Sequence, residues 1–366
     1  MSRPFLIALV ALTLLILAVG FGLDRWLVRA EFDRTSERFA LLGALRRSAL
    51  VGYFDTVDAE LTFWGANEEV RARYQDILAV WSALDATQQA QVRDAFGPGV
   101  DRLEENSTYR AVHDRLHEVA REFVEERGYY DFFLIAPDGD VLYTVEKEDD
   151  FGRSLADGPY ADSGLGQAYR KALATTDSTS TLSDFAPYAP SADAPAMFTA
   201  RPMLDSDGSV LGIIALQLPS ERIQDIMQFT AGMGASGETY LVGEDLLMRS
   251  DSRFSEEPTT LLTTVDTETV HLALAGDQGV KVVDDYRGIP VLSAYSNLSF
   301  DGFNWAVLAE IDHAEIMDNA RESRRVSALG STIAWVIGAL FAWLLRRVDF
   351  GGETSTGAPA LDDLSG

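Results

Sequence analysis

The sequence has no cysteine and only four histidines among its 366 residues. The absence of cysteine excludes disulfide bonds, thiol catalysis, zinc ribbons and iron–sulfur ligation. Basic residues are also scarce: 30 Lys and Arg stand against 57 Asp and Glu, which leaves a net charge of −27. A surface that binds nucleic acid needs clustered Lys and Arg to release counterions from phosphate. The composition therefore excludes nucleic acid as a partner, and an apolar content of 47% excludes a disordered chain.

Two long runs without a charged residue lie near the ends of the chain, at residues 5–23 and 326–345. About twenty apolar residues in a helix cross the hydrocarbon core of a bilayer, so we expect two transmembrane helices. A cleaved signal peptide is the alternative for the first run, although its apolar stretch exceeds the usual length of about 7 to 15 residues. Basic residues beside the runs favour cytoplasmic ends, at residues 1–4 and 346–366. The sequence therefore predicts a two-span protein of the inner (cytoplasmic) membrane, with its central block in the periplasm or extracytoplasmic space.

The second apolar run has a small residue at every fourth position. Small residues at this spacing lie on one helix face and let another helix approach closely. The alternative is that Gly and Ala are simply frequent in membrane spans. The sequence predicts a transmembrane dimer face made of Gly330, Ala334, Gly338 and Ala342.

The hydrophobic pattern between the two runs changes from helix to strand near residue 128. Residues 24–127 have apolar positions three and four apart, as in Leu50, Phe54, Val57 and Leu61, and are predicted to form a helical stalk. The segment FFLIAPDGDVLYTV is an apolar run on each side of an Asp-Gly turn, which indicates a hairpin. A second hairpin pattern follows at 196–218. We therefore expect one antiparallel-sheet module at 128–218.

A second copy of this pattern follows. GETYLVGEDLLMRSD resembles the first hairpin in shape, and residues 279–312 supply the later strands of a second module at 234–312. A connecting helix is expected at 219–233. A D-x-x-E capping pattern predicts a juxtamembrane helix at 313–325, and the polar tail 346–366 is expected to be disordered and cytoplasmic. The predicted fold class is an α+β membrane protein in which a long N-terminal helix backs two tandem modules between two transmembrane helices.

Three strings carry a resemblance to a known family: SALVGYFDTVDAEL, YYDFFLIAPDGDVLYTVEKE and GETYLVGEDLLMRSDSRF. They resemble the double Cache (dCache) sensor regions of bacterial chemoreceptors, sensor kinases and membrane-bound cyclases. The resemblance covers roughly residues 30–320. It implies two PAS-like Cache modules, membrane-distal at 128–218 and membrane-proximal at 234–312. It also implies a homodimer, through the stalk and the transmembrane helices, and a small-molecule ligand in the distal module.

Polar and aromatic side chains on the distal strands and loop are candidates for holding that ligand, since a few such groups fix a small molecule in an apolar cleft. Among them, Arg201 or Lys147 would pair with a carboxylate and Asp184 with an amine. The alternative is that the tyrosines belong to the core and the cations offset an acidic surface. The predicted ligand-binding residues are Tyr130, Tyr143, Lys147, Tyr160, Asp184, Tyr188 and Arg201.

Amino-acid-binding members of the family carry an R-x-W-Y segment followed by Tyr-x-Asp. The comparable segment here, GRSLADGPYADSG, keeps Pro159 and Tyr160 but lacks the Arg and the Trp. This departure speaks against an amino acid as the ligand.

Catalytic and metal-binding motifs are missing from the sequence. It contains no nucleophile elbow, P-loop, H-E-x-x-H or dinucleotide fingerprint, so we expect neither enzyme activity nor a cofactor. His113 and His117 are four residues apart on a predicted helix and could chelate a metal. No third ligand has a recognisable spacing, and helix packing explains both residues equally well. We therefore predict no metal site.

The predicted function is a membrane-anchored small-molecule sensor that signals through its second transmembrane helix. The chain ends 21 residues after Leu345, so no output domain is expected and a membrane-embedded partner would receive the signal. One alternative is a tethered solute-binding or scaffold protein without signalling. The other is a truncated chemoreceptor, sensor kinase or cyclase.

Overall fold

The computed structural model describes residues 3–104, 107–175 and 179–349. By its internal contacts the chain divides into two units. The described part of the first unit is residues 3–37 with 313–349, and the second unit is Arg38–Asp312. Helix α1 (Arg3–Ala66) contributes to both units, whereas α8 (His313–Asp349) belongs to the first.

The first unit consists of α8 and the N-terminal part of α1. Trp335 Nε1 of α8 donates a hydrogen bond to Thr13 Oγ1 of α1 at 3.1 Å. Over the residues that the structure describes, neither helix, nor any other, combines the length and the apolar character that a membrane crossing requires. Each predicted span is only one part of a longer helix that also carries charged residues. The prediction of transmembrane helices at 5–23 and 326–345 is therefore wrong. The flanking spans in the predicted fold class and the inner-membrane location are corrected with it.

The small-residue face predicted on the second run lies on α8. Gly330 and Ala334 are exposed and Gly338 is half-buried, whereas the side chain of Ala342 lies outside the described residues. Its role in association stays a prediction. Helix α8 continues to Asp349, so it includes the first residues of the tail expected at 346–366, and the rest of that tail lies outside the described residues.

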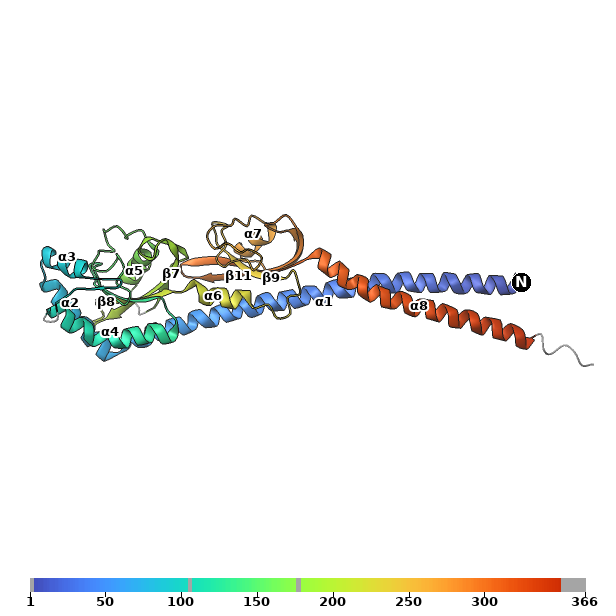
Figure 1. Cartoon of the computed structure of the whole chain (residues 1–366), viewed down its shortest axis with the longest axis horizontal. Coiled ribbons are helices and arrows are strands. Elements are labelled where there is room, and N and C mark those ends of the chain that lie inside the picture. Colours follow the sequence, from blue (N-terminus) through green and yellow to red (C-terminus); the bar gives the residue numbers. More distant parts are fainter. Residues whose placement is uncertain (1–2, 105–106, 176–178, 350–366) are drawn as a thin grey trace, which may run out of the picture. The chain divides into compact units, whose positions relative to one another are not determined.

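The second unit contains the distal module, which is built on a six-stranded antiparallel sheet (Figure 1). The strand order is β4-β3-β8-β7-β5, and β6 pairs with residues 194–196 at the start of β7. The strands are β3 (Asp131–Ile135), β4 (Val141–Thr144), β5 (Thr181–Leu182), β6 (Ala186–Tyr188), β7 (Ala194–Leu204) and β8 (Val210–Leu218).

Both faces of the distal sheet are covered, because successive residues of a strand point to opposite sides. In β3, Phe132 and Leu134 pack in a core shared with the α1, α2 and α4 side chains, whereas Phe133 and Ile135 pack against α5. All five β3 side chains are buried. The helices are α2 (Glu68–Ala83), α3 (Ala86–Ala95), α4 (Thr108–Arg127) and α5 (Gly164–Ala174), with a small hairpin of β1 (Phe96–Gly97) and β2 (Val100–Asp101).

Helix α2 approaches the distal sheet at a glycine. A Cβ on Gly212 of β8 would lie 2.1 Å from the Tyr74 ring and hydroxyl. The Tyr74 hydroxyl donates to the Leu211 carbonyl oxygen at 3.0 Å. Only glycine at this position allows the contact without displacing the tyrosine.

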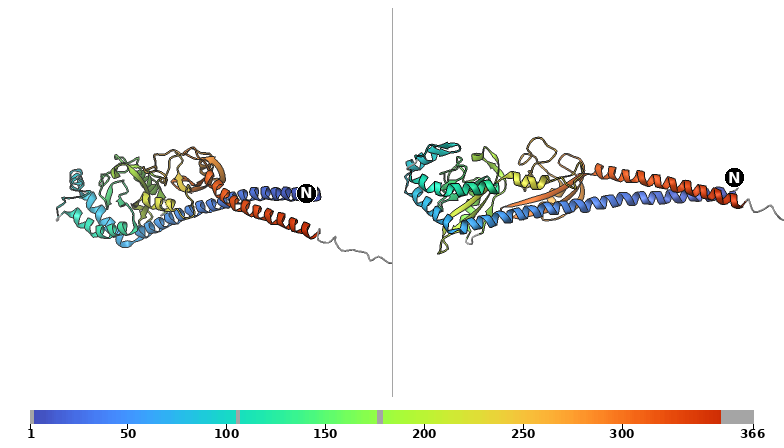
Figure 2. Two further views of the ribbon diagram at one scale, coloured as in Figure 1. Left: turned by 45° about the vertical axis from the view of Figure 1, so that its right-hand side comes forward. Right: turned by 60° about the horizontal axis from the view of Figure 1, so that its bottom comes forward.

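The proximal module has a four-stranded antiparallel sheet in the order β10-β11-β12-β9, with α7 against one face and α1 against the other. The two sheets follow one another along the part of α1 that belongs to this unit (Figure 2). The elements are α6 (Ser220–Gln228), β9 (Glu238–Val242), α7 (Glu268–Leu274), β10 (Gly279–Asp284), β11 (Pro290–Phe300) and β12 (Phe303–Asp312).

Candidate functional site

A group of buried polar side chains lies at one end of the distal sheet, on the face that α5 covers. Asp131, the first residue of β3, is paired in register with Gln217 of β8, and Gln217 is paired with Phe198 of β7. Residues directly opposite each other share a face, and Phe198 packs in the α5 core. We define the distal polar cluster as Asp131, Asp150, Tyr188, Ser191 and Gln217, each at most 7% exposed.

The Asp131 carboxylate is held by the turn that follows β4. Its Oδ1 accepts from the backbone N–H of Val145 at 2.8 Å and of Phe132 at 2.6 Å, and its Oδ2 accepts from the Thr144 hydroxyl. Burial, reinforced by the nearby Asp150 carboxylate, raises the pKa of Asp131 well above its usual range. Asp131 therefore fixes the turn that follows β4.

Two buried oxygen atoms in this cluster have no hydrogen-bond partner. The Tyr188 hydroxyl donates to Asp150 Oδ2 at 2.5 Å, but Asp150 Oδ1 accepts nothing. Gln217 Nε2 donates to Ser191 Oγ at 3.2 Å, but Gln217 Oε1 accepts nothing. Burial raises the pKa of Asp150 to about 7, and the Tyr188 hydrogen bond opposes that rise. Buried acceptors without a donor are costly, so the cluster is prepared for a ligand that carries donors.

Tyr130 and Tyr160, two of the predicted ligand residues, lie at the edge of the distal polar cluster. Tyr130 is 38% exposed and donates to Glu148 Oε1 at 2.7 Å, while Ser191 donates to Glu148 Oε2 at 2.6 Å. The Tyr160 ring lies 6.2 Å from the ring of Tyr188. Burial raises the pKa of Tyr130 and of Tyr160 to about 12, and the hydrogen bond that each hydroxyl donates to a carboxylate adds to the rise. Three predicted residues, Tyr130, Tyr160 and Tyr188, are thus brought together.

Tyr143 and Lys147 lie on the other face of the sheet, against α4. The Tyr143 hydroxyl is 2.9 Å from His117 Nδ1, and Lys147 Nζ is 3.4 Å from His117 Nε2. Lys147 Nζ also lies 4.7 Å from the centre of the Phe96 ring, and burial lowers the Lys147 pKa. These two residues are separated by the sheet from the distal polar cluster.

The two histidines of α4 are neighbours, with ring centres 4.6 Å apart. Burial lowers the pKa of His113 to about 3 and of His117 to about 4, and the Lys147 charge contributes to both changes. In the part of the chain that the structure describes, no group of three or more His, Cys, Asp or Glu side chains is arranged to hold a metal ion.

Arg201 also lies away from the cluster, beside α1. Its NH1 is 3.6 Å from Asp58 Oδ1 and donates to Ser180 Oγ at 3.4 Å. Its side chain is 14% exposed. Arg201 of β7 therefore forms an ion pair with α1.

Asp184 joins the distal module to the proximal one. Residues 183–185 interrupt the pairing of β5 and β6 with β7, and Asp184 there accepts from Arg249 Nε at 3.0 Å and Arg249 NH2 at 2.9 Å. The Trp305 indole N–H of β12 also donates to Asp184 Oδ1, at 2.8 Å. The neighbouring Phe185 ring is parallel to the Trp305 ring at 6.0 Å. We call Asp184, Phe185, Arg249 and Trp305 the inter-module clamp.

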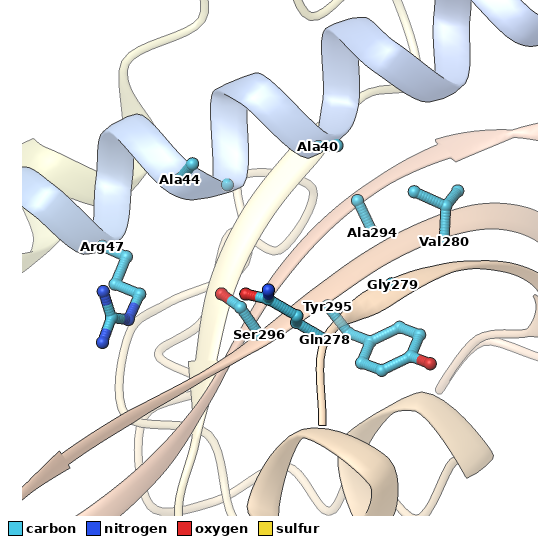
Figure 3. Close-up of a pocket in the computed structure, with 10 residues that line it drawn as sticks. Ala40, Ala44, Arg47, Gln278, Gly279, Val280, Ala294, Tyr295 and Ser296 are labelled. Atoms are coloured by element: carbon cyan, nitrogen blue, oxygen red, sulfur yellow. The ribbon is translucent and has the colours of Figure 1, made fainter. Parts of the chain in front are cut away.

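A cavity of about 430 Å³ lies elsewhere, between α1 and strands β10 and β11 of the proximal module (Figure 3). Its walls are mostly small, with Ala40 and Ala44 on the helix and Gly279 and Ala294 on the strands. Its one charged side chain, Arg47, already donates through Nε to the Asn297 carbonyl oxygen at 2.6 Å. Its uncharged polar side chains are those of Gln278, Tyr295 and Ser296.

Sequence reasoning missed four residues at the centre or edge of the distal site: Asp131, Asp150, Ser191 and Gln217. Two of them had a detectable signal. Asp131 opens the apolar strand DFFLI, and Gln217 interrupts the apolar strand VLGIIALQL. A polar residue in a buried strand costs free energy unless it is bonded, which marks both positions.

A family model described as the Cache domain, in its double form, matches residues 53–320. The chain belongs to the Cache domain family. The match covers both sheets and the clamp between them, so the region is a double Cache sensor region. Among proteins with curated descriptions, no match was found.

Solved structures to which this chain is similar include the sensory domain of the Campylobacter jejuni chemoreceptor Tlp3, at 14% identity and a TM-score of 0.47, covering 80% of this chain and 99% of that one. The ligand-binding domain of the Pseudomonas fluorescens chemoreceptor CtaA, in complex with L-serine, has 15% identity and a TM-score of 0.38, covering 80% and 97%. The ligand-binding domain of the Pseudomonas aeruginosa amino-acid chemoreceptor PctC, in complex with GABA, has 14% identity and a TM-score of 0.42, covering 76% and 100%. These TM-scores are below 0.5 and do not support the family membership, which depends on the match to the family model over residues 53–320.

Proposed function

We propose that this chain is a small-molecule sensor whose distal module binds a ligand carrying an ammonium group. The observation that supports this best is the pair of buried, unbonded acceptors, Asp150 Oδ1 and Gln217 Oε1. An ammonium group has donors for both atoms, and its charge compensates the buried Asp150 carboxylate. The Tyr188 ring beside them adds an aromatic surface, which attracts cations. The role proposed for these two oxygens is to bind the ligand.

The experiment is a thermal-shift screen of the purified full-length protein against small amines and their matched alcohols. A ligand that binds only the folded state raises the melting temperature. We expect stabilisation by at least one amine, none by its alcohol, and a loss of about tenfold or more in apparent affinity in Asp150→Asn. Asp162→Asn removes an exposed carboxylate of the same module and should leave the shift unchanged. The proposal is wrong if no ligand depends on Asp150.

We also propose that ligand binding reaches the proximal module through the inter-module clamp. Tyr188 of the distal polar cluster is only four residues from Asp184, and the two lie on one segment that runs along β7. A ligand that displaces Tyr188 would move this segment, and Asp184 would carry the movement to Arg249 and Trp305. Because a ligand shifts an equilibrium only by its differential affinity for two states, the movement need only be small.

We further propose that two copies associate through the exposed side of α1. Leu41, Leu45 and Phe63 are 59%, 54% and 67% exposed, on the side away from the buried stripe of the same helix. A groove of about 660 Å³ continues this surface between Phe63 and Phe123 of α4. Exposed apolar side chains on one side of a helix are typical of an interface. Sedimentation of the full-length protein should show a dimer that Phe63→Asp weakens and Leu262→Asp, on a 73% exposed leucine of the proximal module, does not.

A further inference from the structure

The proximal module has a pair of buried acids at the register position that Asp131 and Gln217 occupy in the distal one. Glu238 is the first residue of β9, as Asp131 is the first of β3, and it is paired in register with Glu310 of β12. Glu238 and Glu310 are each 1% exposed. Alternate residues of these strands, such as Tyr240 of β9 and Leu308 of β12, pack against α7. Glu238 and Glu310 therefore point to the face that α7 covers. We call them the proximal acid pair.

The hydrogen bonds around the proximal acid pair leave one oxygen without a donor. The Tyr240 hydroxyl donates to Glu310 Oε2 at 2.8 Å, and Ser252 and Tyr286 donate to Glu238 at 2.8 and 3.0 Å. Glu310 Oε1 is buried and has no hydrogen-bond partner. The Ser293 hydroxyl, opposite Glu310 on β11, donates to Thr269 Oγ1 of α7 at 3.1 Å, and it also lies close enough to Glu310 to oppose the rise of the Glu310 pKa.

The proximal acid pair also lacks a cation. Burial raises the pKa of Glu238, and the charge of Arg287 opposes that rise. Arg287 itself donates to Asp285 at 2.7 Å and to Asp312 at 3.0 Å. Within the described ranges, no Lys, Arg or His forms an ion pair with either glutamate. Burial raises the Glu310 pKa to about 7, and the charges of Glu238 and Asp285 add to the rise. Two neighbouring carboxylates in a buried site require a proton or a cation between them.

We propose that the proximal module binds a small primary ammonium group between Glu238 and Glu310. Such a group donates to Glu310 Oε1, to Glu238 and to a neighbouring hydroxyl, which matches the acceptors present. The rings of Tyr240 and Tyr286 are 5.7 Å apart at 81° and form two walls that attract a cation. The described side chains form no set of three metal ligands, so an organic cation fits the pair better than a metal ion.

Tyr286 is the route by which the ammonium group would enter. It is half-buried, whereas Glu238, Tyr240, Ser252 and Glu310 are buried. It stands in the short turn closed by the bond from the Gly288 N–H to the Asp285 carbonyl oxygen. Rotation of its side chain opens the pair to solvent, and its hydroxyl is then replaced by a donor of the ligand.

The test uses full-length protein that carries Asp150→Asn, so that a result at the proximal acid pair does not depend on the distal site. The probe is methylammonium, followed by ligand-observed NMR, with tetramethylammonium as the control cation that lacks N–H donors. We expect methylammonium to bind, and Glu310→Gln and Glu238→Gln each to weaken it about tenfold or more. Glu256→Gln removes an exposed charge from a nearby loop and should leave the affinity unchanged.

Three results would overturn the proposal: no methylammonium binding in the Asp150→Asn protein, equal binding of tetramethylammonium, or unchanged affinity in both glutamine variants. Gln keeps the shape of Glu and removes a buried charge, so these variants should remain folded. Near-UV circular dichroism checks this directly. The distal proposal stands or falls separately, because it is tested at Asp150.

Discussion

Replacement of Asp184 by Asn tests the inter-module clamp. Both guanidinium bonds of Arg249 to Asp184 depend on the carboxylate, and the Arg249 side chain is only 3% exposed. Removal of one partner of a buried ion pair costs about 3 to 5 kcal/mol. Asp245 stays bonded to Arg249 at 2.9 Å, and the Asp184 side chain is 28% exposed, so we expect a lower cost of about 2 to 3 kcal/mol.

Differential scanning calorimetry of the full-length protein measures this cost. At about 2 to 4 °C per kcal/mol for a domain of this size, Asp184→Asn should lower the melting temperature by roughly 4 to 12 °C. Asp162→Asn is the matched control and should change it by less than about 1 °C. The double variant Asp184→Asn with Arg249→Met should recover part of the loss, because it no longer leaves a buried guanidinium without its partner. Equal melting temperatures for Asp184→Asn and the control would refute the clamp.

Two further predictions concern pH and packing. Burial raises the pKa of Asp150 from its ordinary 3.8 to about 7, so its contribution to stability is present below about pH 4 and is lost as the pH rises through 7. The free energy of unfolding, measured with urea, should therefore fall between pH 5 and pH 8, and Asp150→Asn should reduce that fall. An unchanged pH dependence in the variant would contradict the assignment. Gly212→Ala should destabilise the protein by about 1 to 3 kcal/mol, because the added Cβ meets Tyr74. Gly52→Ala lies on an open helix surface and should stabilise the protein by up to about 1 kcal/mol. Destabilisation of the same size by both variants would show that the Tyr74 contact is not the cause.

The sequence was informative where structure depends on neighbouring residues. The Asp138-Gly139 turn predicts the β3–β4 hairpin, since Gly139 adopts a φ of 103° there. The repeat of the hairpin pattern predicts a second module, which the proximal sheet provides. The prediction of two membrane spans is wrong, because no described helix is both long enough and apolar enough to cross a membrane.

The candidate site was harder to predict because its residues meet across long sequence separations. The sequence predicts Asp184 as a ligand residue, and the structure adds a partner that local patterns do not show, Arg249, 65 positions away. Tyr143 and Tyr188 both stand in or beside distal strands, and only the register of the sheet shows that they belong to opposite faces. A one-residue change in register would reverse that assignment, which local patterns cannot detect.

The short segment from Asp184 to Tyr188 also bears on how quickly the protein could respond. A segment of this length rearranges in microseconds to milliseconds, without any element having to unfold. Capture of a ligand present at about 1 μM, at a typical association rate of about 10⁶ M⁻¹s⁻¹, takes roughly a second. The delay between a change in concentration and a change in the proximal module would then be set by diffusion and occupancy, and the internal relay would add almost nothing to it.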